Sequence, residues 1–156
     1  MKLNVEWGRP LPLKDGSKQN LIYNVDLKKL PQALGVYVLG RRFGTNFEAL
    51  YVGQALEIRS RIRGQLKNLP LMLHLKNAKT GKRIVVAGRF VARPGQTPKK
   101  CLPLIERSLI RYFLAEGHDL VNKQGTRLRR HEISSKGKHP KRFIPGLMYL
   151  DRSKGE

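Results

Sequence analysis

Cysteine is nearly absent from this chain of 156 residues, and Cys101 is the only one. A single cysteine excludes an intrachain disulfide framework and a cysteine-rich zinc site, and its scarcity is typical of a reducing compartment. Long apolar runs are also missing, because no stretch approaches the roughly 18 residues that span a bilayer. The segment Met1–Pro10 lacks the apolar core of a secretory signal. These absences predict a cytoplasmic protein that does not bind a membrane.

Acidic residues are also few, with 11 Asp and Glu against 32 Lys and Arg and a net charge of +21. A field of this size attracts polyanions and raises the rate at which they are encountered. The basic residues are spread along the chain, and no Lys-rich amphipathic helix carries bulky aromatics on its opposite face. This pattern favours nucleic acid over an anionic membrane as the partner. Charge alone does not separate DNA from RNA, or binding from cleavage.

The apolar content of 40% is enough for one packed domain over residues 1–156. β-rich or alternating runs predict strands at Leu3–Trp7, Gly35–Leu39, Ala49–Gly53, Arg83–Ala92 and Gly146–Leu150. Helical spacing of apolar residues predicts helices in Leu56–Leu66 and Leu102–Ala115, whereas residues 68–82 fit either a helix or an alternating strand. This order predicts an α+β fold, with a small three-stranded, mainly antiparallel sheet covered by helices.

Three finer predictions concern the connections and the chain ends. The link between the strands at 35–39 and 49–53 is expected to be longer than a tight turn. Asp26 is expected to cap a short helical turn within residues 25–34. The terminal extensions are expected to add strands, and we expect Leu3–Trp7 to pair antiparallel with Leu147–Leu150, because both are short apolar-alternating runs.

Two triplets stand on the successive central strands. Gly35-Val36-Tyr37 is followed by Tyr51-Val52-Gly53, and Arg61 lies ten residues beyond Tyr51. Glu106 lies early in the later predicted helix, and Asn122 follows that helix. Each triplet alone is a weak signal, but the ordered set over residues 33–124 resembles the GIY-YIG nuclease superfamily. Residues 1–32 and 125–156 are then extensions of a nuclease core.

The resemblance implies a divalent-metal-dependent endonuclease that hydrolyses DNA phosphodiester bonds. It implies one Mg²⁺ or Mn²⁺ ion per site, with Glu106 as the protein ligand. It implies Tyr37 as the general base, Tyr51 as the residue that positions the phosphate or the water, Arg61 as the phosphate clamp and Asn122 as a partly structural residue. Gly35 and Gly53 are the motif glycines, which let the backbone lie close to neighbouring elements.

The residues also suit this chemistry independently of the resemblance. A single carboxylate can hold Mg²⁺, which otherwise keeps waters and phosphate oxygens as ligands. The planar guanidinium of Arg61 matches phosphate oxygens. Only the deprotonated form of a tyrosine accepts a proton. A phenol with a pKa near 10 therefore needs nearby positive charge to lower that pKa.

Alternative interpretations remain open for each site residue. The two tyrosines are also compatible with ordinary half-buried sheet positions, and Glu106 with a surface pair to Arg107 or Arg111. Arg59 or Arg63 is an alternative inward-facing arginine to Arg61. Some members of the superfamily have a histidine where this chain has Gln65, and His74 is the only substitute nearby, or else a packing residue. The other histidines, His118, His131 and His139, are expected at the surface.

Many of the remaining basic residues are expected to contact the phosphates of duplex DNA without reading sequence. The expected contacts are Arg41, Arg42, Arg59, Lys76, Lys82, Arg83, Arg127, Arg129, Arg130, Lys138, Lys141 and Arg142. The expected biological role is restriction or host–phage defence, and a mobile-element nuclease, a repair nickase and a toxin are alternatives. The alternative from another class is a non-catalytic nucleic-acid-binding protein that retains the fold. A homodimer is compatible with double-strand cleavage.

Overall fold

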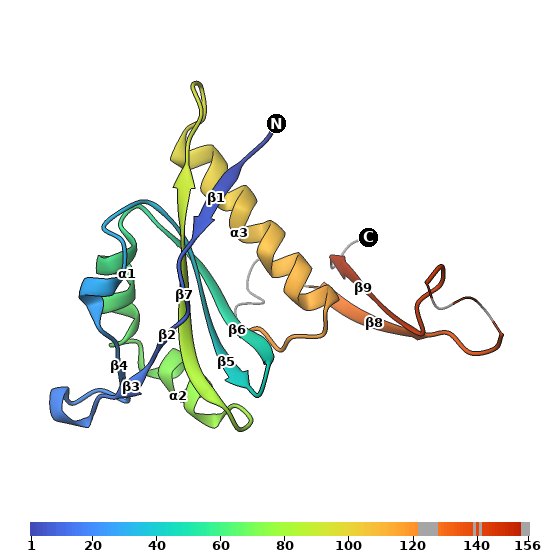
Figure 1. Cartoon of the computed structure of the whole chain (residues 1–156), viewed down its shortest axis with the longest axis horizontal. Helices are drawn as coiled ribbons and strands as arrows, with labels where there is room; N and C mark the ends of the chain where they lie inside the picture. The colour runs from blue at the N-terminus through green and yellow to red at the C-terminus, as the bar shows by residue number, and fades with distance from the viewer. Residues whose placement is uncertain (122–127, 139, 141, 154–156) are drawn as a thin grey trace.

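The computed structural model describes residues 1–121, 128–138, 140 and 142–153, and the side chains of 128–130 and 149–153 are not described. Figure 1 shows one antiparallel sheet at the centre, with helices on both of its faces. Its strands run in the order β1 (Asn4–Trp7), β7 (Lys82–Val91), β5 (Gly35–Phe43) and β6 (Asn46–Ala55). The short strand β2 (Leu11–Pro12) also pairs with β7. The α+β class and the antiparallel sheet are confirmed, and the N-terminal extension makes the sheet five-stranded.

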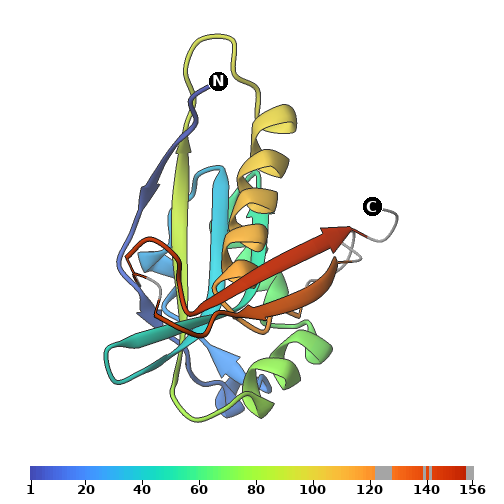
Figure 2. The ribbon, with the colours of Figure 1, turned by 90° about the vertical axis from the view of Figure 1, so that its right-hand side faces the viewer.

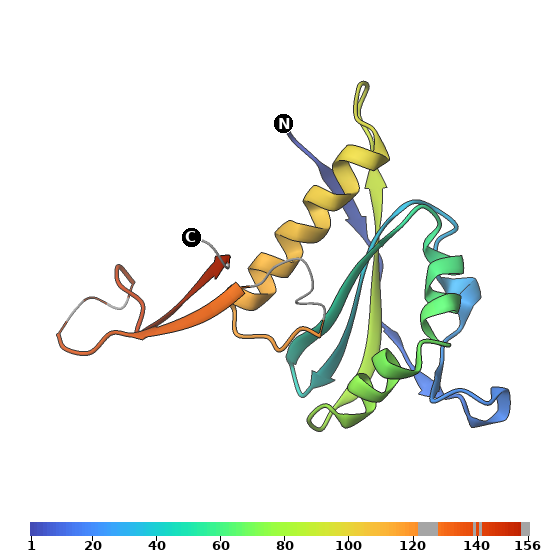
Figure 3. The same cartoon turned by 180° about the vertical axis from the view of Figure 1, so that it is seen from behind.

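Helices cover both faces of the sheet because β5, β6 and β7 carry apolar residues on both sides. Helices α1 (Ile58–Gln65) and α2 (Leu69–Asn77) pack on one face, and α3 (Pro98–Ala115) packs on the other (Figures 1 and 3). The segment 68–82, which the sequence left open, is therefore mostly the helix α2. Asn68 caps it by accepting a hydrogen bond from the Leu71 amide at 3.3 Å.

Alternation along β5 sorts its side chains between the two faces. Tyr37 and Leu39 point into the cluster under α1 and α2, which also holds Ile62. Val36 and Val38 point to the opposite face, against residues of α3 such as Ile105. The sheet therefore fixes which side chains can reach a site near α1.

The connection between β5 and β6 differs from the prediction. The strands continue to Phe43 and from Asn46, so only two residues join them, and Gly44 takes a positive φ of 61°. Such two-residue hairpin turns favour glycine at a positive φ. The predicted long connection is thus wrong, because most of it is paired strand.

The expected pairing between the two chain ends is also wrong. β1 pairs with β7, with Val5 opposite Phe90, whereas β9 (Leu147–Ser153) pairs with β8 (Leu128–Ser134). The β8–β9 hairpin is a separate two-stranded sheet that extends beyond the end of α3 (Figures 1 and 2). Both predicted terminal strands exist, but each pairs with a strand that is closer to it in sequence than the other terminal strand is.

The remaining short elements connect the N-terminal strands to β5. β3 (Lys14–Asp15) pairs with β4 (Tyr23–Asn24) around the 3₁₀ turn η1 (Ser17–Gln19). A second 3₁₀ turn, η2 (Leu27–Lys29), begins at Asp26, whose carboxylate accepts from the Lys28 amide at 3.3 Å. The predicted cap at Asp26 is confirmed.

The chain after α3 returns to the edge strand β6. The Ala49 amide donates to His118 Nδ1 at 2.8 Å, and the Val121 amide donates to the Leu50 carbonyl at 2.8 Å. The His118 ring also lies 5.1 Å from the Phe113 ring, centre to centre. His118 was expected to be a surface residue, so this prediction is corrected. In the part of the chain that the structure describes, no helix is long and apolar enough to span a bilayer.

Candidate active site

Four of the five predicted catalytic residues line one cleft of about 570 Å³. Each comes from a different element: Tyr37 from β5, Tyr51 from β6, Arg61 from α1 and Glu106 from α3. The cleft lies at the edge of the sheet formed by β6, where α1 from one face and α3 from the other come close. Asn122, the fifth residue, lies outside the described residues. Residues up to 69 positions apart in the sequence therefore meet at one site.

The two triplets contact each other directly across the sheet. Tyr37 on β5 pairs with Gly53 on β6, so the last residues of the two triplets are cross-strand neighbours. A Cβ atom built on Gly53 would collide with the Tyr37 ring and its hydroxyl. Gly53 thus provides the space that the ring of Tyr37 occupies.

Gly35 has a different neighbour. A Cβ atom on this residue would collide with the carbonyl oxygen of Gly88 on β7 and contact Ile58 of α1 at 3.0 Å. A side chain would therefore separate β5 from β7 or push α1 outward. Since α1 carries Arg61, this glycine sets the position of the arginine indirectly.

A side-chain amide connects the two tyrosines to α1. Gln65 Nε2 donates to the Tyr37 hydroxyl at 2.8 Å and to the Tyr51 hydroxyl at 3.2 Å. Asn68 Nδ2 in turn donates to Gln65 Oε1 at 3.2 Å, while Asn68 Oδ1 caps α2. Because the cap uses the oxygen of Asn68, its NH₂ group faces Gln65, which turns the NH₂ group of Gln65 toward the tyrosines. From the sequence, Gln65 was interpreted only as a departure from the GIY-YIG pattern. Its contact with both tyrosines was not predicted.

Tyr37 is almost completely enclosed, with 1% of its surface exposed. Burial raises the pKa of its phenol well above the usual value, and the hydrogen bond from Gln65 and the charge of Arg61 only partly oppose this. The proximity of Tyr51, whose ring centre lies 6.1 Å away, raises it further. Tyr37 in this structure is therefore a neutral hydrogen-bonding group, which does not favour its predicted role as general base.

Of the three candidate arginines on α1, Arg61 lines the cleft. Arg59 points elsewhere, because its Nε and Nη2 atoms donate to the Leu30 carbonyl at 3.0 and 2.8 Å. Two residues along a helix correspond to a rotation of about 200°, so the two side chains leave α1 on opposite flanks. Arg63 is exposed and is not among the residues that line the cleft.

Glu106 is half-buried on α3 and faces the cleft. Burial raises the pKa of its carboxyl, and the hydrogen bond with Gln54 and the charge of Arg61 oppose the shift. The ion pairs found among the described residues are Arg41–Glu48 and Arg89–Glu6, so Glu106 is not paired with Arg107 or Arg111 there. A partly dehydrated carboxylate that faces a cleft suits a hard cation.

The donor set around the cleft limits which metal it could hold. Among the described residues no three His, Cys, Asp or Glu side chains lie together in a metal-binding group. Zinc and calcium sites made by protein side chains need several such ligands. Mg²⁺ needs only one or two carboxylates, since water and substrate phosphates complete its octahedron. Glu106 therefore fits Mg²⁺ better than these two ions.

Two of the predicted DNA contacts are corrected by the structure. Arg41 is buried and pairs with Glu48 at 2.9 Å, and its Nη1 donates to the Thr80 carbonyl at 2.6 Å. Arg83 is buried too, and it donates to the carbonyl oxygens of Leu75 at 2.6 Å and Ala78 at 2.8 Å. Both guanidinium groups hold loops of the protein together, so neither is available to a phosphate.

The other predicted contacts fall into three groups. Arg42, Lys76, Lys82, Lys138 and Arg142 are exposed and accessible to a polyanion. Arg129 and Arg130 lie on β8, where only the backbone is described. Arg127 and Lys141 lie outside the described residues. Lys99 at the start of α3, which also reads from the sequence as a phosphate contact, is a second cation that lines the cleft.

His74 does not line the cleft. Its Nε2 atom is buried and has no hydrogen-bond partner within the described residues. It therefore packs within α2 and does not replace the histidine that this chain lacks at position 65.

Comparisons with protein-family models, with curated proteins and with solved structures found no match to this chain. Its function is therefore inferred from the residues of the cleft.

Proposed function

We propose that this chain is a divalent-metal-dependent endonuclease that hydrolyses DNA phosphodiester bonds through a single-metal site of the GIY-YIG kind. The observation that carries the proposal is the meeting of Tyr37, Tyr51, Arg61 and Glu106 at one cleft. A hydroxyl pair, a guanidinium and a carboxylate can supply the proton transfer, the charge stabilisation and the metal ligand of phosphodiester hydrolysis. The net charge of +21 supports a polyanionic substrate.

The arrangement divides the chemical tasks among the four side chains. Arg61 binds a non-bridging phosphate oxygen and stabilises the charge that develops in the transition state. Gln65 donates to both tyrosine oxygens, so the hydroxyl hydrogen of Tyr37 remains available to the attacking water or to the phosphate. We assign the acceptance of the water's proton to the oxygen of Tyr51, acting as a phenolate that becomes the phenol, because its ring is only partly buried whereas Tyr37 is held neutral.

Glu106 would hold the metal ion, and Gln54 lines the same cleft and lowers the pKa of its carboxyl. A bound Mg²⁺ or Mn²⁺ supplies charge neutralisation at the phosphate and at the leaving oxygen.

One cleft per chain acts on one strand at a time. We therefore expect a nicked circle as the first product from supercoiled plasmid, with linear DNA following from a second event or from a pair of chains. A role in restriction or host–phage defence requires in addition that cleavage occurs at defined sequences.

The test is incubation of the purified protein with supercoiled plasmid, with and without about 5 to 10 mM Mg²⁺. Glu106→Ala should abolish nicking, whereas the matched control Glu116→Ala, an exposed acid just past the same helix, should not. Unchanged plasmid together with tight, salt-sensitive DNA binding would instead favour the non-catalytic binding protein. Discrete fragments from a long substrate would support the restriction role, and a smear would exclude it.

A further inference from the structure

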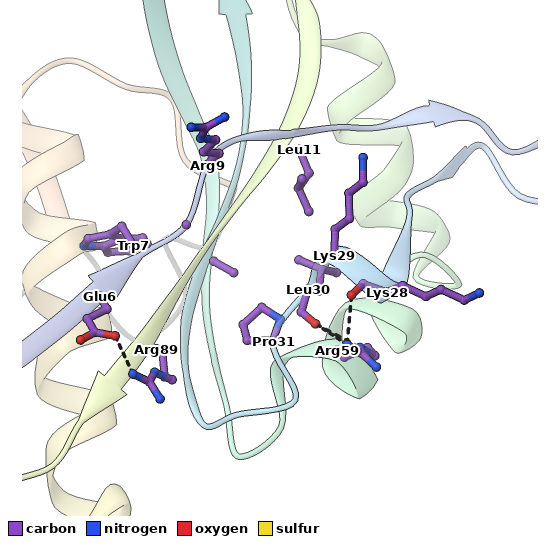
Figure 4. A pocket seen from close by; sticks show the side chains of 12 residues that line it. Glu6, Trp7, Arg9, Leu11, Lys28, Lys29, Leu30, Pro31, Arg59 and Arg89 are labelled. Atoms are coloured by element: carbon purple, nitrogen blue, oxygen red, sulfur yellow. Dashed lines mark hydrogen bonds and ion pairs between the residues drawn. The ribbon is translucent and has the colours of Figure 1, made fainter.

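A second basic groove lies on the other flank of α1 (Figure 4). It has a volume of about 590 Å³, and it is lined by the N-terminal segment from β1 to β2, by η2, by α1 and by β7. Five cationic side chains and one carboxylate line it: Arg9, Lys28, Lys29, Arg59, Arg89 and Glu6. Only Arg59 among the cations was expected to contact nucleic acid.

We propose that this groove binds the sugar–phosphate backbone of a nucleic acid, on a stretch that lies outside the candidate active site. The identity of the ligand rests on the proposed function, but the binding itself does not require cleavage. Arg59 and Arg61 leave α1 on opposite flanks, one toward each groove. A strand that crosses α1 would therefore contact both.

The wall of the groove is held in place by Arg59. Its Nη2 donates to the carbonyl oxygens of Lys28 at 3.2 Å and Leu30 at 2.8 Å, which fixes η2 against α1 (Figure 4). Its Nη1 donates no hydrogen bond within the described part of the chain, so those hydrogens can bind a phosphate oxygen. The fixed wall reduces the entropy lost when a ligand binds.

The exposed cations supply the charge. Lys28 and Lys29 project from η2, and Arg9 projects from the opposite wall (Figure 4). The single carboxylate, Glu6, is already paired with Arg89 at 2.6 Å, and both side chains are exposed. A surface pair of this kind contributes little, so the groove keeps an excess of positive charge. Phosphates that enter it release condensed counterions, which drives binding at low salt.

The shape favours nucleic acid over a membrane. The cations line a concave groove, and a chain of phosphates can enter such a groove whereas a layer of lipid headgroups cannot. Trp7 borders the groove with 45% of its surface exposed, and it is the only tryptophan of the chain. Its emission therefore reports on the surroundings of β1, at the border of this groove and of an apolar hollow beside α3.

The experiment compares two triple variants in a Glu106→Ala background without divalent metal. The groove variant is Arg9→Gln, Lys28→Gln and Lys29→Gln. The control variant is Lys14→Gln, Lys18→Gln and Lys79→Gln, three exposed lysines that line neither this groove nor the active-site cleft. Both lower the net charge equally. Kd for a labelled 20-base-pair duplex is measured by fluorescence anisotropy at several salt concentrations.

We expect the groove variant to weaken binding about tenfold or more and to reduce the slope of log Kd against log salt by about 2 to 3. The control variant should change that slope by less than about 1. Equal losses in the two variants would overturn the proposal, because the total charge would then account for binding. Unchanged binding by the groove variant would overturn it too. Circular dichroism melts verify that both variants fold.

Tryptophan emission gives an independent measurement on the chain with native surface charges. DNA should change the emission of Trp7 and saturate at the concentration at which anisotropy saturates. No change at saturation would overturn the proposal. Vesicles of phosphatidylserine are a third arm: a loss of vesicle binding by the groove variant, with DNA binding intact, would assign the groove to membranes and also overturn it.

The two proposals fail separately. If plasmid is never cut but the groove variant loses DNA binding, the nuclease proposal fails and the groove proposal stands. If plasmid is cut in a Glu106-dependent manner and the groove variant binds like the control, the nuclease proposal stands and the groove proposal fails.

Discussion

The ring of Tyr37 lies over the backbone of Gly53, its cross-strand partner, in the space that a side chain on that residue would occupy. The last residues of the two triplets thus form one packing unit. The glycine of the second triplet is needed so that the tyrosine of the first can lie flat against β6 with its hydroxyl beside Gln65. The spacing of the motif is therefore a packing requirement as well as a catalytic one.

Gly53→Ala should be destabilising and inactive. The added methyl collides with a buried ring, which has little room to move, so we expect unfolding to become easier by about 1 to 3 kcal/mol. Displacement of the hydroxyl by even 1 Å should lower nicking about 100-fold. Chemical denaturation and plasmid nicking measure the two effects. Gly64→Ala is the control, because a Cβ there meets no neighbouring atom; equal losses in both variants would contradict the packing argument.

Asn68→Asp separates the capping of α2 from the orientation of Gln65. Aspartate keeps an oxygen for the Leu71 amide but cannot donate to Gln65 Oε1. We expect stability to change by less than about 1 kcal/mol, while nicking falls about tenfold because the Gln65 amide is no longer held toward the tyrosines. Asn68→Ala should lose both properties. Full activity in Asn68→Asp would show that the amide relay is unimportant.

Glu106→Gln should raise thermal stability while it removes activity. Burial raises the pKa of the folded carboxyl, so its contribution to stability is complete below the unfolded pKa and is lost as pH rises through the folded pKa. The neutral amide does not suffer this loss. We expect a melting temperature higher on the order of 1 °C at pH 7 in EDTA, since partial exposure weakens the effect. The difference should vanish below about pH 4. A variant that is less stable than the wild type at pH 7 would refute this.

Arg41 and Arg42 are adjacent in sequence but should behave oppositely. Arg41→Ala removes a buried guanidinium from Glu48 and from the Thr80 carbonyl, so unfolding should become easier by about 3 kcal/mol. The salt slope of DNA binding should stay the same. Arg42→Ala should change stability by less than about 0.5 kcal/mol. Because its exposed side chain is expected to bind a phosphate, the slope should fall by about 1. If Arg41→Ala instead reduced the salt slope and left stability unchanged, the original prediction that Arg41 contacts DNA would hold.

Arg61→Ala should lower nicking by about 100- to 1000-fold, because the guanidinium that stabilises the phosphate charge in the transition state is lost. Arg61→Lys should recover only part of the rate, since lysine keeps the charge without the planar fork. Arg63→Ala, on the exposed side of the same helix, is the control and should stay within about twofold of the wild type. An equal loss in Arg63→Ala would mean that α1 contributes only general charge. Single-turnover nicking rates distinguish these outcomes.

The resemblance of the ordered motif set to a known superfamily predicted the residues of the site, and local signals placed them on strands and helices. Period-two apolar patterns identified the strands that present Tyr37 and Tyr51, and the offset of two residues on a helix separated Arg59 from Arg61. The structure brings these side chains to one cleft, together with Glu106. The α+β class followed from the order of the same elements.

The pairing of the chain ends was not predictable from local pattern. Leu3–Trp7 and Leu147–Leu150 are similar alternating runs, and pairing is decided by which sheet edge is available. One local signal did exist: Gly88 interrupts β7, and a Cβ there would meet Val5 at 2.6 Å and Trp7 at 2.9 Å. A glycine inside a strand marks such a close approach.

The structural roles of the buried Arg41 and Arg83 could not be predicted from the sequence either. Arg83 resembles its exposed basic neighbours until the course of α2 is known, because its partners are carbonyl oxygens and not acidic side chains. A composition rich in arginine therefore overstates the charge that a substrate meets.

The segment that follows α3 has a consequence for how copies of this protein encounter one another. An outermost strand is a template on which foreign backbone can assemble into aggregates. His118 and Val121 occupy that template along the Ala49–Leu50 stretch of β6. The same strand continues into the wall of the candidate active site at Tyr51 and Gly53. The first half of β6 is thus covered against pairing with a foreign strand, while its second half lines the candidate active site.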